Sequence, residues 1–478
     1  MTGGNKIEKS LFELIQVAAG NRNALSSVPS QDEWQQLYGL LSKHTLLGIG
    51  FVAIQKLPEE QWPPKMLVLK WTSVATAISH QNKTLNEECK SLCEEFRHDG
   101  VASVVIKGQS NFENYPEELR WYRTPGDIDL WCEARNGVEI GEMVNGEVIK
   151  SEFHGIAGVI EYCKQYERCR GRDIPWHRVL YYHCELKSDN GIAIEPHYRI
   201  SYLHSPVRNH RLQKWFKGQF DICLQNRCSL GFPVLTSSVN VVYQLVHLYR
   251  HVFEGGVGLR QLMDYYFALR VWHNDVMERK DLQSQGMWSE GLGTAVMSAQ
   301  EVMAVLRSFG MTKFAAAVMW VLNEVFENEE CILNEECRMK NEECIENEEC
   351  RMKNEECSEA DDMGEQQLFT HCKFKEEFIK LKQVSSIGQQ LKEKCVCEPW
   401  MICEPNEREG RKLLEEIMKG GNFGQYDNRD AALKNGGMVK HGVWKLKRVM
   451  RLVRSYPEEA LWEPVFRVWH LGWRKIHG

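Results

Sequence analysis

The chain has 478 residues, which is more than one ordinary hydrophobic core supports, so we expect about two or three packed units. Its composition, with 43% hydrophobic, 26% charged and 10% aromatic residues, is that of a folded soluble protein. The net charge of −7 excludes a global positive field that would draw the protein to nucleic acid or to an anionic membrane. Nucleic acid therefore remains a possible partner only through a local basic patch.

The sequence has no sign of membrane insertion or secretion. No stretch approaches the roughly 20 apolar residues that a membrane-spanning helix needs. The N-terminus, Met-Thr-Gly-Gly-Asn-Lys, lacks the apolar run of a signal peptide. We therefore expect a cytoplasmic protein without membrane contact. The 17 cysteines are an odd number spread over a long chain, which predicts reduced thiols rather than disulfides.

Residues 1–97 predict an N-terminal helical region, because apolar residues recur there at helical spacing. Ser30, followed three residues later by Glu33, predicts a capped helix start. Two further helices are expected at residues 66–78 and 81–96.

The pattern changes at residues 98–230, where we expect a small α/β unit. Residues 101–106, Val-Ala-Ser-Val-Val-Ile, form a short β-branched apolar run that is typical of a buried strand. The sequence Ser-Asp-Asn-Gly at 188–191 predicts a hairpin turn. Further strands are expected at 127–131, 179–186 and 191–200, with a helical stretch near 137–175.

Helical regions are expected again at 231–327 and 358–478, on either side of a repetitive segment at 328–357. In that segment the tetrapeptide Asn-Glu-Glu-Cys occurs five times, and 11 Glu stand against 4 Lys or Arg. Because the segment has too few apolar residues to offset its ordering entropy by packing, we interpret it as a solvated low-complexity insertion. A thiol-rich site for a metal or a partner is the alternative, although the cysteines lack the close paired spacing of a zinc site.

The end of the chain is basic and aromatic. Residues 440–478 carry nine Lys or Arg against three Glu, interleaved with tryptophans. Such a pattern can bind nucleic acid. We favour the other interpretation, in which the aromatic residues pack helices whose outer face is basic.

Asp127 and Asp129 lie two residues apart on a predicted strand, so both carboxylates are expected on the same face. Glu195 ends an apolar approach on a later predicted strand. If the two strands are neighbours, the three acids form one cluster, and divalent metal is the natural compensation for their repulsion. Mg²⁺ takes carboxylate and phosphate oxygens together, and a cluster of this kind can hold two ions.

The residues before the acid pair are suited to phosphate. Lys107-Gly108 ends the first strand with a cation and a glycine, whose backbone can approach a phosphate closely. Arg123, four residues before Asp127, could also meet phosphate.

These features together resemble nucleotidyltransferases of the DNA polymerase β-like superfamily, which carry a Gly-containing turn, an Asp-hydrophobic-Asp strand and a third acid on a later strand. A nearer resemblance is to a bacterial group of mostly uncharacterised nucleotidyltransferase-family proteins. The motifs that resemble this group are Lys107-Gly108, Tyr115-Pro116, Arg123, Gly126-Asp127-Ile128-Asp129-Leu130 and Glu195-Pro196-His197. Outside this core, the resemblance extends to His247, His251, the Gly258-Leu259-Arg260 turn, Asp264 and residues 420–424.

The resemblance implies a fold and a reaction. The fold is α/β (α+β), a small mixed-sheet nucleotidyltransferase core flanked by N-terminal and C-terminal helical regions. The reaction is transfer of a nucleoside monophosphate from an NTP to an acceptor, with Mg²⁺ (or Mn²⁺) and release of pyrophosphate; a small molecule, RNA and protein all remain open as acceptors. Asp127, Asp129 and Glu195 would be the catalytic residues and metal ligands, and Lys107, Gly108, Ser110, Arg123 and Gly126 would bind the nucleotide.

The turn departs from the superfamily pattern. Gln109 follows Gly108, where the superfamily usually has Gly or Ser, and Ser110 comes one residue later. The interval from Gly108 to Asp127 is also longer than usual. These departures keep a second hypothesis open, a catalytically inactive module that retains the fold and binds or regulates.

His247 and His251 are four residues apart on a predicted helix, which is the spacing of paired metal ligands. The intervening sequence lacks the Glu of the helical zinc motif, and no third ligand stands out. We therefore interpret the pair as structural.

Overall fold

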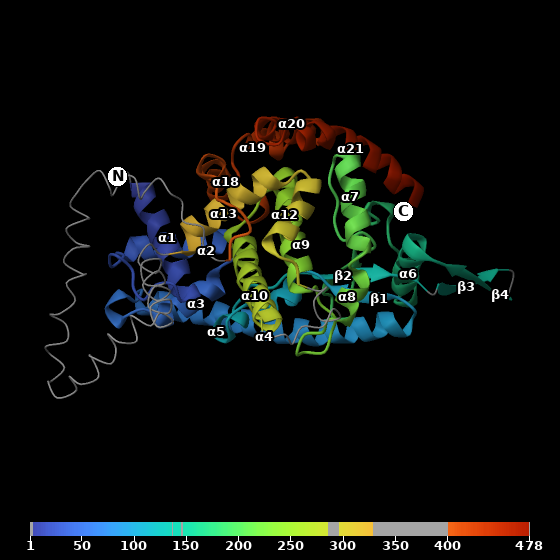
Figure 1. Cartoon of the computed structure of the whole chain (residues 1–478), viewed down its shortest axis with the longest axis horizontal. Coiled ribbons are helices and arrows are strands. Elements are labelled where there is room, and N and C mark those ends of the chain that lie inside the picture. Colours follow the sequence, from blue (N-terminus) through green and yellow to red (C-terminus); the bar gives the residue numbers. More distant parts are fainter. Residues whose placement is uncertain (1–2, 136, 145–146, 285–295, 328–399, 478) are drawn as a thin grey trace. The chain divides into compact units, whose positions relative to one another are not determined.

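The computed structural model describes residues 3–135, 137–144, 147–284, 296–327 and 400–477 (Figure 1). Within these ranges, residues up to Phe326 and from Trp400 onward belong to one compact unit. The repetitive segment at 328–357 lies outside the described residues, and so do the expectations made for it.

The N-terminal region is helical, as predicted. The Ser30 hydroxyl accepts a hydrogen bond from the Glu33 amide, and the Glu33 carboxylate accepts one from the Ser30 amide at 2.7 Å, so the predicted cap is confirmed. The helices here are α1 (Gly3–Ala19), α2 (Gln31–Lys43), α3 (Leu47–Lys56) and α4 (Lys65–His98), with the short 3₁₀ turn η1 (Glu59–Gln61) before α4.

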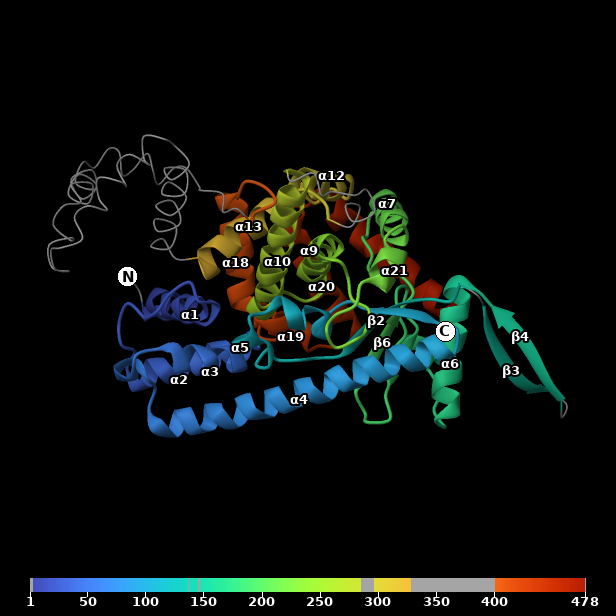
Figure 2. The ribbon, with the colours of Figure 1, turned by 60° about the horizontal axis from the view of Figure 1, so that its bottom comes forward.

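The prediction of two separate helices at 66–78 and 81–96 was wrong, because α4 runs through both without a break. No Gly or Pro interrupts this stretch, and the buried face of α4 continues from Ile78 through Asn82 to Leu85. Figure 2 shows α4 as one long rod beside the sheet.

The central sheet has four strands in the order β1-β2-β6-β5. The β1–β2 and β5–β6 pairs are antiparallel, whereas β2 and β6 are parallel, so the sheet is mixed as expected. The strands are β1 (Ala102–Val105), β2 (Ile128–Glu133), β5 (Leu186–Lys187) and β6 (Ala193–His197). The hairpin around 188–191 is confirmed, but of the expected strand 179–186 only Leu186 belongs to β5, which continues to Lys187.

Residues 138–153 correct a second expectation, since they form an antiparallel hairpin of β3 (Val138–Val144) and β4 (Glu147–Phe153) rather than a helix. An Asn-Gly pair stands between these strands in the sequence and is a strong hairpin signal. The predicted helical character of the region holds only for α6 (Gly155–Cys169).

Helices cover both faces of the sheet. Val105, Ile128 and Leu130 pack with residues of α4 and α6, whereas Val104 and Trp131 pack on the opposite side with the helices that follow the sheet. This alternation is the two-residue period of a strand, and it places Asp129 on the second side. The covering helix that matters most for the site is α9 (Ser237–Glu254), which is buried along nearly its whole length.

The remaining elements are helices and 3₁₀ turns around the core and a C-terminal set that continues after residue 400. They are η2 (Gly108–Asn114), α5 (Glu117–Arg120), η3 (Trp176–Arg178), α7 (Pro206–Lys217), α8 (Phe220–Gln225), α10 (Leu259–Ser284), α12 (Ala299–Ser308), α13 (Thr312–Phe326), α18 (Glu407–Gly420), η5 (Asn422–Gly424), α19 (Ala431–Lys434), α20 (Met438–Leu452) and α21 (Pro457–His477).

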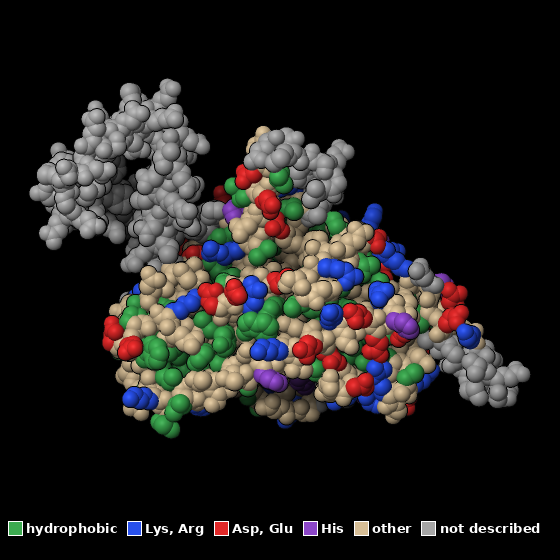
Figure 3. All heavy atoms as spheres, turned by 90° about the horizontal axis from the view of Figure 1, so that it is seen from below, with side chains coloured by type: hydrophobic (Ala, Val, Ile, Leu, Met, Phe, Trp, Pro, Cys, Tyr) green, Lys and Arg blue, Asp and Glu red, His purple; other side chains and the backbone are tan. Residues whose placement is uncertain are grey.

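The surface seen from below carries acidic and basic side chains interspersed with one another (Figure 3). Among the described helices, none combines the length and the apolar character needed to cross a bilayer. The expected fold class, a small mixed α/β core flanked by helices, is confirmed.

Candidate active site

Three carboxylates meet where β2 and β6 run side by side. The parallel register sets Asp129 directly beside Glu195, and Asp127 immediately precedes β2. One carboxylate oxygen from each of the three lies within 4.8 Å of the others. The condition on which the sequence hypothesis depended, that the two strands are neighbours, is therefore met.

A lysine side chain and a histidine side chain contact this carboxylate cluster. Lys107 Nζ lies 2.5 Å from Asp129 Oδ1 and 3.9 Å from Glu195 Oε2. His197 Nε2 lies 3.0 Å from the same Asp129 oxygen and 3.4 Å from Glu195 Oε2. Asp129 is 1% exposed, and its second oxygen, Oδ2, has no hydrogen-bond partner in the described part of the chain. A buried carboxylate oxygen without a donor is an open ligand position.

The crowding of like charges shifts the pKa values of the cluster. The charge of Asp129, together with partial burial, raises the pKa of Asp127 to about 6. Burial alone would raise the pKa of Glu195, but hydrogen bonding to His197 and the charge of Lys107 lower it overall. Burial opposes the charged form of Lys107, yet the charge of Asp129 outweighs it and holds the pKa of this lysine well above its usual value.

The turn after β1 requires its glycine. Gly108 has φ +56, and a Cβ there would lie 3.4 Å from the Asp127 carbonyl oxygen. The side chain of Gln109 is directed elsewhere, since its amide donates to Asn86 Oδ1 at 2.5 Å. Ser110 is buried and does not line the cavity described below, whereas Asn111 does.

Arg123 is held by a buried ion pair. Its Nε and Nη2 atoms donate to the two oxygens of Asp264 at 2.6 and 2.7 Å, and the Tyr115 hydroxyl also donates to Asp264 at 2.7 Å. The backbone carbonyl of Arg123 accepts from Asn82 at 2.8 Å. The Arg123 guanidinium therefore forms part of the cavity wall, and the two nitrogens that form its bidentate pair are both bound to Asp264.

The acids open into a cavity of about 260 Å³. Of the eight residues predicted as catalytic, metal-binding or nucleotide-binding, all except Ser110 line it, namely Lys107, Gly108, Arg123, Gly126, Asp127, Asp129 and Glu195. Its opposite wall comes from α9 and α10, and the lining residues there are Gln244, His247, Arg250, His251, Glu254, Arg260, Gln261 and Asp264.

Four of these eight residues of the opposite wall, Gln244, Arg250, Glu254 and Gln261, were not identified from the sequence. Gln244, His247, His251 and Glu254 are spaced by three or four residues, so they form one polar stripe on a helix that is otherwise buried. Such a stripe on a buried helix indicates that the helix faces a polar site. The family resemblance and the four-residue spacing point to the two histidines, but not to the stripe as a whole.

Phe423 was also missed as an individual residue. It lies in η5 with φ 50 and ψ 23, is 39% exposed and lines the cavity. The centre of its ring lies 5.0 Å from that of His251. A non-glycine residue in the left-handed region is uncommon and often marks a functional position.

A model of the family described as uncharacterised nucleotidyltransferases matches residues 30–286, more than half of the chain. The chain belongs to this family. The match includes the three acids, the Lys107-Gly108 turn and the polar stripe of α9, so the resemblance to this nucleotidyltransferase family is confirmed. Phe423 lies outside the matched range. The link to the polymerase β-like superfamily and the bacterial origin remain predictions. No curated protein and no solved structure gave a match to the chain.

Proposed function

We propose that this nucleotidyltransferase-family protein transfers a nucleoside monophosphate from an NTP to an acceptor hydroxyl or similar group, with release of pyrophosphate and with the help of a divalent cation. The observation that carries the proposal is the meeting of Asp127, Asp129 and Glu195 on adjacent strands, at one wall of a cavity whose other wall holds basic side chains.

The three acids fit Mg²⁺ or Mn²⁺. All three offer carboxylate oxygens, which are the ligands that these ions prefer, and Asp129 Oδ2 is buried without a hydrogen-bond donor among the described residues. Asp127, Asp129 and Glu195 would hold the ion. When bound, a divalent cation supplies charge stabilisation to phosphate oxygens during nucleotidyl transfer.

The chain's own cations surround the space left for the triphosphate. Lys107 lies against the acids, and Arg250 and Arg260 line the opposite wall. Arg250 Nε lies 3.6 Å from Glu254 Oε2, and Arg260 Nη1 donates to the Thr124 carbonyl at 2.8 Å, so both guanidinium groups are held in place at the cavity, where they would attract phosphate oxygens. We therefore assign triphosphate binding to Lys107, the Gly108 turn, Gly126, Arg250 and Arg260. Arg123 shapes the wall through its pair with Asp264.

Glu195 has a second role in the proposal. Its contacts with His197 and Lys107 favour the ionised form, and it reaches the cavity, where an acceptor hydroxyl would approach. An ionised carboxylate at this position can accept the proton that the acceptor loses.

The rival function is a catalytically inactive module that binds or regulates. Two observations favour it: Gln109 points away from the cavity, and the Arg123 guanidinium is occupied by Asp264. The intact acid cluster favours the enzyme. Metal-dependent NTP binding without transfer to any acceptor would support the rival.

The test uses NTPs labelled at either the α or the γ phosphate. The purified full-length chain is incubated with each NTP, Mg²⁺ or Mn²⁺, and cell extract as the source of acceptor. Nucleotidyl transfer predicts that α-label becomes attached to an acceptor while γ-label appears as pyrophosphate. Treatment of the labelled product with nuclease or protease then separates RNA, protein and small-molecule acceptors. Absence of α-label transfer with every NTP and both metals would contradict the proposal.

A further inference from the structure

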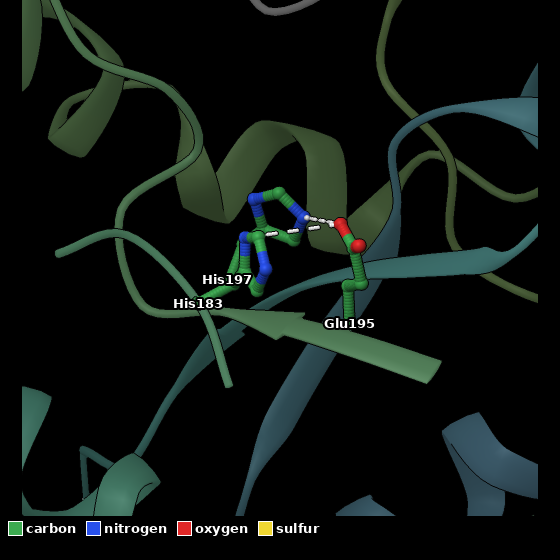
Figure 4. Close-up of side chains that lie close together, drawn as sticks. All are labelled: His183, Glu195 and His197. Carbon is green, nitrogen blue, oxygen red and sulfur yellow. Dashed lines mark ion pairs between the residues drawn. The ribbon is translucent and has the colours of Figure 1, made fainter. Parts of the chain in front are cut away.

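Beside the three-carboxylate cluster lies a second group of potential metal ligands, consisting of His183, Glu195 and His197 (Figure 4). We propose that these residues form a site for a divalent transition-metal ion of the Mn²⁺, Co²⁺ and Zn²⁺ class, which shares Glu195 with the carboxylate cluster. The proposal goes beyond the proposed function and does not depend on it.

The backbone brings the two histidines to the same place. His183 pairs with His197 in an isolated antiparallel bridge, and His197 is the last residue of β6. Residues opposite each other in such a pair direct their side chains to the same face. Figure 4 shows both rings turned toward the Glu195 carboxylate.

The distances suit a common ion. Glu195 Oε2 lies 3.7 Å from His183 Nδ1 and 3.4 Å from His197 Nε2. Two ligand atoms that each lie about 2.0–2.2 Å from one ion at tetrahedral angles are separated by about 3.3–3.6 Å. The three side chains therefore need only small movements to bind one ion.

His183 supplies an independent reason to expect a ligand. It is 2% exposed, and neither of its ring nitrogens makes a hydrogen bond within the described residues. A buried polar atom without a partner is costly, and coordination to a metal would satisfy Nδ1.

The ligand types distinguish this site from the carboxylate cluster. Imidazole nitrogen binds first-row transition metals such as Mn²⁺, Co²⁺ and Zn²⁺, whereas Mg²⁺ prefers oxygen alone. Glu195 is 21% exposed at its side chain and contacts both groups, so it can connect the two sites.

The test uses the metal alone and the full chain. Chelator-treated protein is titrated with Co²⁺, and binding is followed by visible absorption of the bound ion. We expect a Co²⁺ site whose affinity is reduced at least about tenfold in His183→Gln and in His197→Gln. The matched control is His210→Gln, because His210 is exposed and belongs neither to the cluster nor to the cavity lining, and this variant should bind like the wild type.

Two further measurements test the metal site without relying on the histidine variants and separate it from the proposed function. Pulsed electron paramagnetic resonance of Mn²⁺ bound to the wild type should show coupling to imidazole nitrogen, which needs no variant to fold. Asp127→Asn should keep the Co²⁺ spectrum while it abolishes transfer, so a failure of the proposed function would leave this result intact. Co²⁺ binding that is absent in the wild type or unchanged in His183→Gln, or a Mn²⁺ spectrum without nitrogen coupling, overturns the proposal.

A separate observation, the strained loop at the mouth of the cavity, supports a second inference, which rests on the proposed function. We infer that the ring of Phe423 stacks on the base of the bound nucleotide. The ring is partly exposed, lines the cavity and has His251 against one side. Its loop is held by close backbone packing, since a Cβ on Gly424 would lie 1.8 Å from the Gly255 carbonyl oxygen. Such packing explains how the left-handed conformation of Phe423 is maintained.

Binding of ATP and of inorganic tripolyphosphate, each with Mg²⁺, tests this role. Loss of stacking in Phe423→Ala should weaken ATP binding about tenfold and leave tripolyphosphate binding unchanged, while Phe423→Trp should retain ATP binding. Tyr426→Ala is the control, because Tyr426 is an exposed aromatic residue near the loop that does not line the cavity. Equal ATP affinity in wild type and Phe423→Ala, or a parallel loss of tripolyphosphate binding, overturns the stacking role alone. A wild type that binds neither compound contradicts the proposed function as well.

Discussion

Two clusters of charged residues line the same cavity and differ in whether their charges are balanced within the chain. In the first, Arg123 and Asp264 face each other in a bidentate pair that Tyr115 completes. In the second, three carboxylates crowd together, with Lys107 as their cationic contact among the described residues. The first cluster satisfies its charges within the chain, whereas the second leaves negative charge and a buried carboxylate oxygen unsatisfied.

The difference separates structural charges from functional ones. The Arg123–Asp264 pair joins the segment before β2 to α10, 141 residues away in sequence, so its loss should damage the fold. The carboxylate cluster gains nothing for the fold from its own repulsion, so partial neutralisation should be tolerated by the fold and not by the activity. The predictions below test this contrast.

The largest effect on stability is expected when one partner of the Arg123–Asp264 pair is removed. Arg123→Met or Asp264→Leu should each lower the free energy of unfolding by about 3–5 kcal/mol, because the remaining charge is buried and unpaired. The double variant should recover much of this loss. Denaturant unfolding measures it, and Lys150→Ala, which removes an exposed ion pair with Glu139, should produce no measurable change. If the single variants are as stable as the wild type, the Arg123–Asp264 pair does not have the structural role that distinguishes it from the carboxylate cluster.

A smaller effect is expected for Lys107→Met. Without the ammonium group, the three carboxylates lose their cationic neighbour, and the metal-free protein should lose about 2–3 kcal/mol of stability. Adding Asp127→Asn should restore part of this loss, since it removes one of the repelling charges. The four free energies of unfolding form a double-mutant cycle, and strict additivity would mean that the two charges do not interact.

The smallest effect concerns pH. The folded pKa of Asp127 is raised to about 6 by Asp129, so in metal-free protein the folded state keeps this proton at pH values where the unfolded state has released it. The wild type should therefore lose stability relative to Asp127→Asn as pH rises from about 4 to 6. Because the side chain remains solvent-exposed, we expect a difference of only about 1 kcal/mol above pH 6 and almost none at pH 4. If the free energies of unfolding of the two proteins change in parallel with pH, the repulsion between Asp127 and Asp129 is not supported.

The sequence predicts those parts of the site that depend on local spacing. Asp127 and Asp129 belong together because a strand repeats every two residues, and Lys107 precedes a turn that needs Gly108. Glu195 could be included only on the condition that β2 and β6 are neighbours, which is a tertiary pairing.

Other features depend on contacts that local patterns do not specify. The pairing of Arg123 with Asp264 connects distant segments, so the sequence does not indicate this buried ion pair. The opposition of His183 and His197 arises from an isolated bridge in a region where the sequence predicts a longer strand. The position of Phe423 depends on backbone packing between residues 255–258 and 421–424.

Two fold errors had local causes. The two helices expected at 66–78 and 81–96 are one helix, α4, because neither Gly nor Pro is present between them to end a helix. At residues 138–153, the expected helical stretch did not take account of the Asn-Gly pair, which is a hairpin signal, and only the following α6 is helical.

The most direct test of the central claim compares transfer and stability in the Asp127→Asn/Asp129→Asn double variant. Both substitutions keep side-chain shape and remove charge from the proposed metal ligands. We predict that transfer of α-labelled nucleotide, measured with Mg²⁺ or Mn²⁺, falls by several orders of magnitude. The Tm of the metal-free protein should stay at the wild-type value or rise slightly. Transfer at the wild-type rate, or a variant that no longer folds, would contradict the assignment of these carboxylates to the active site.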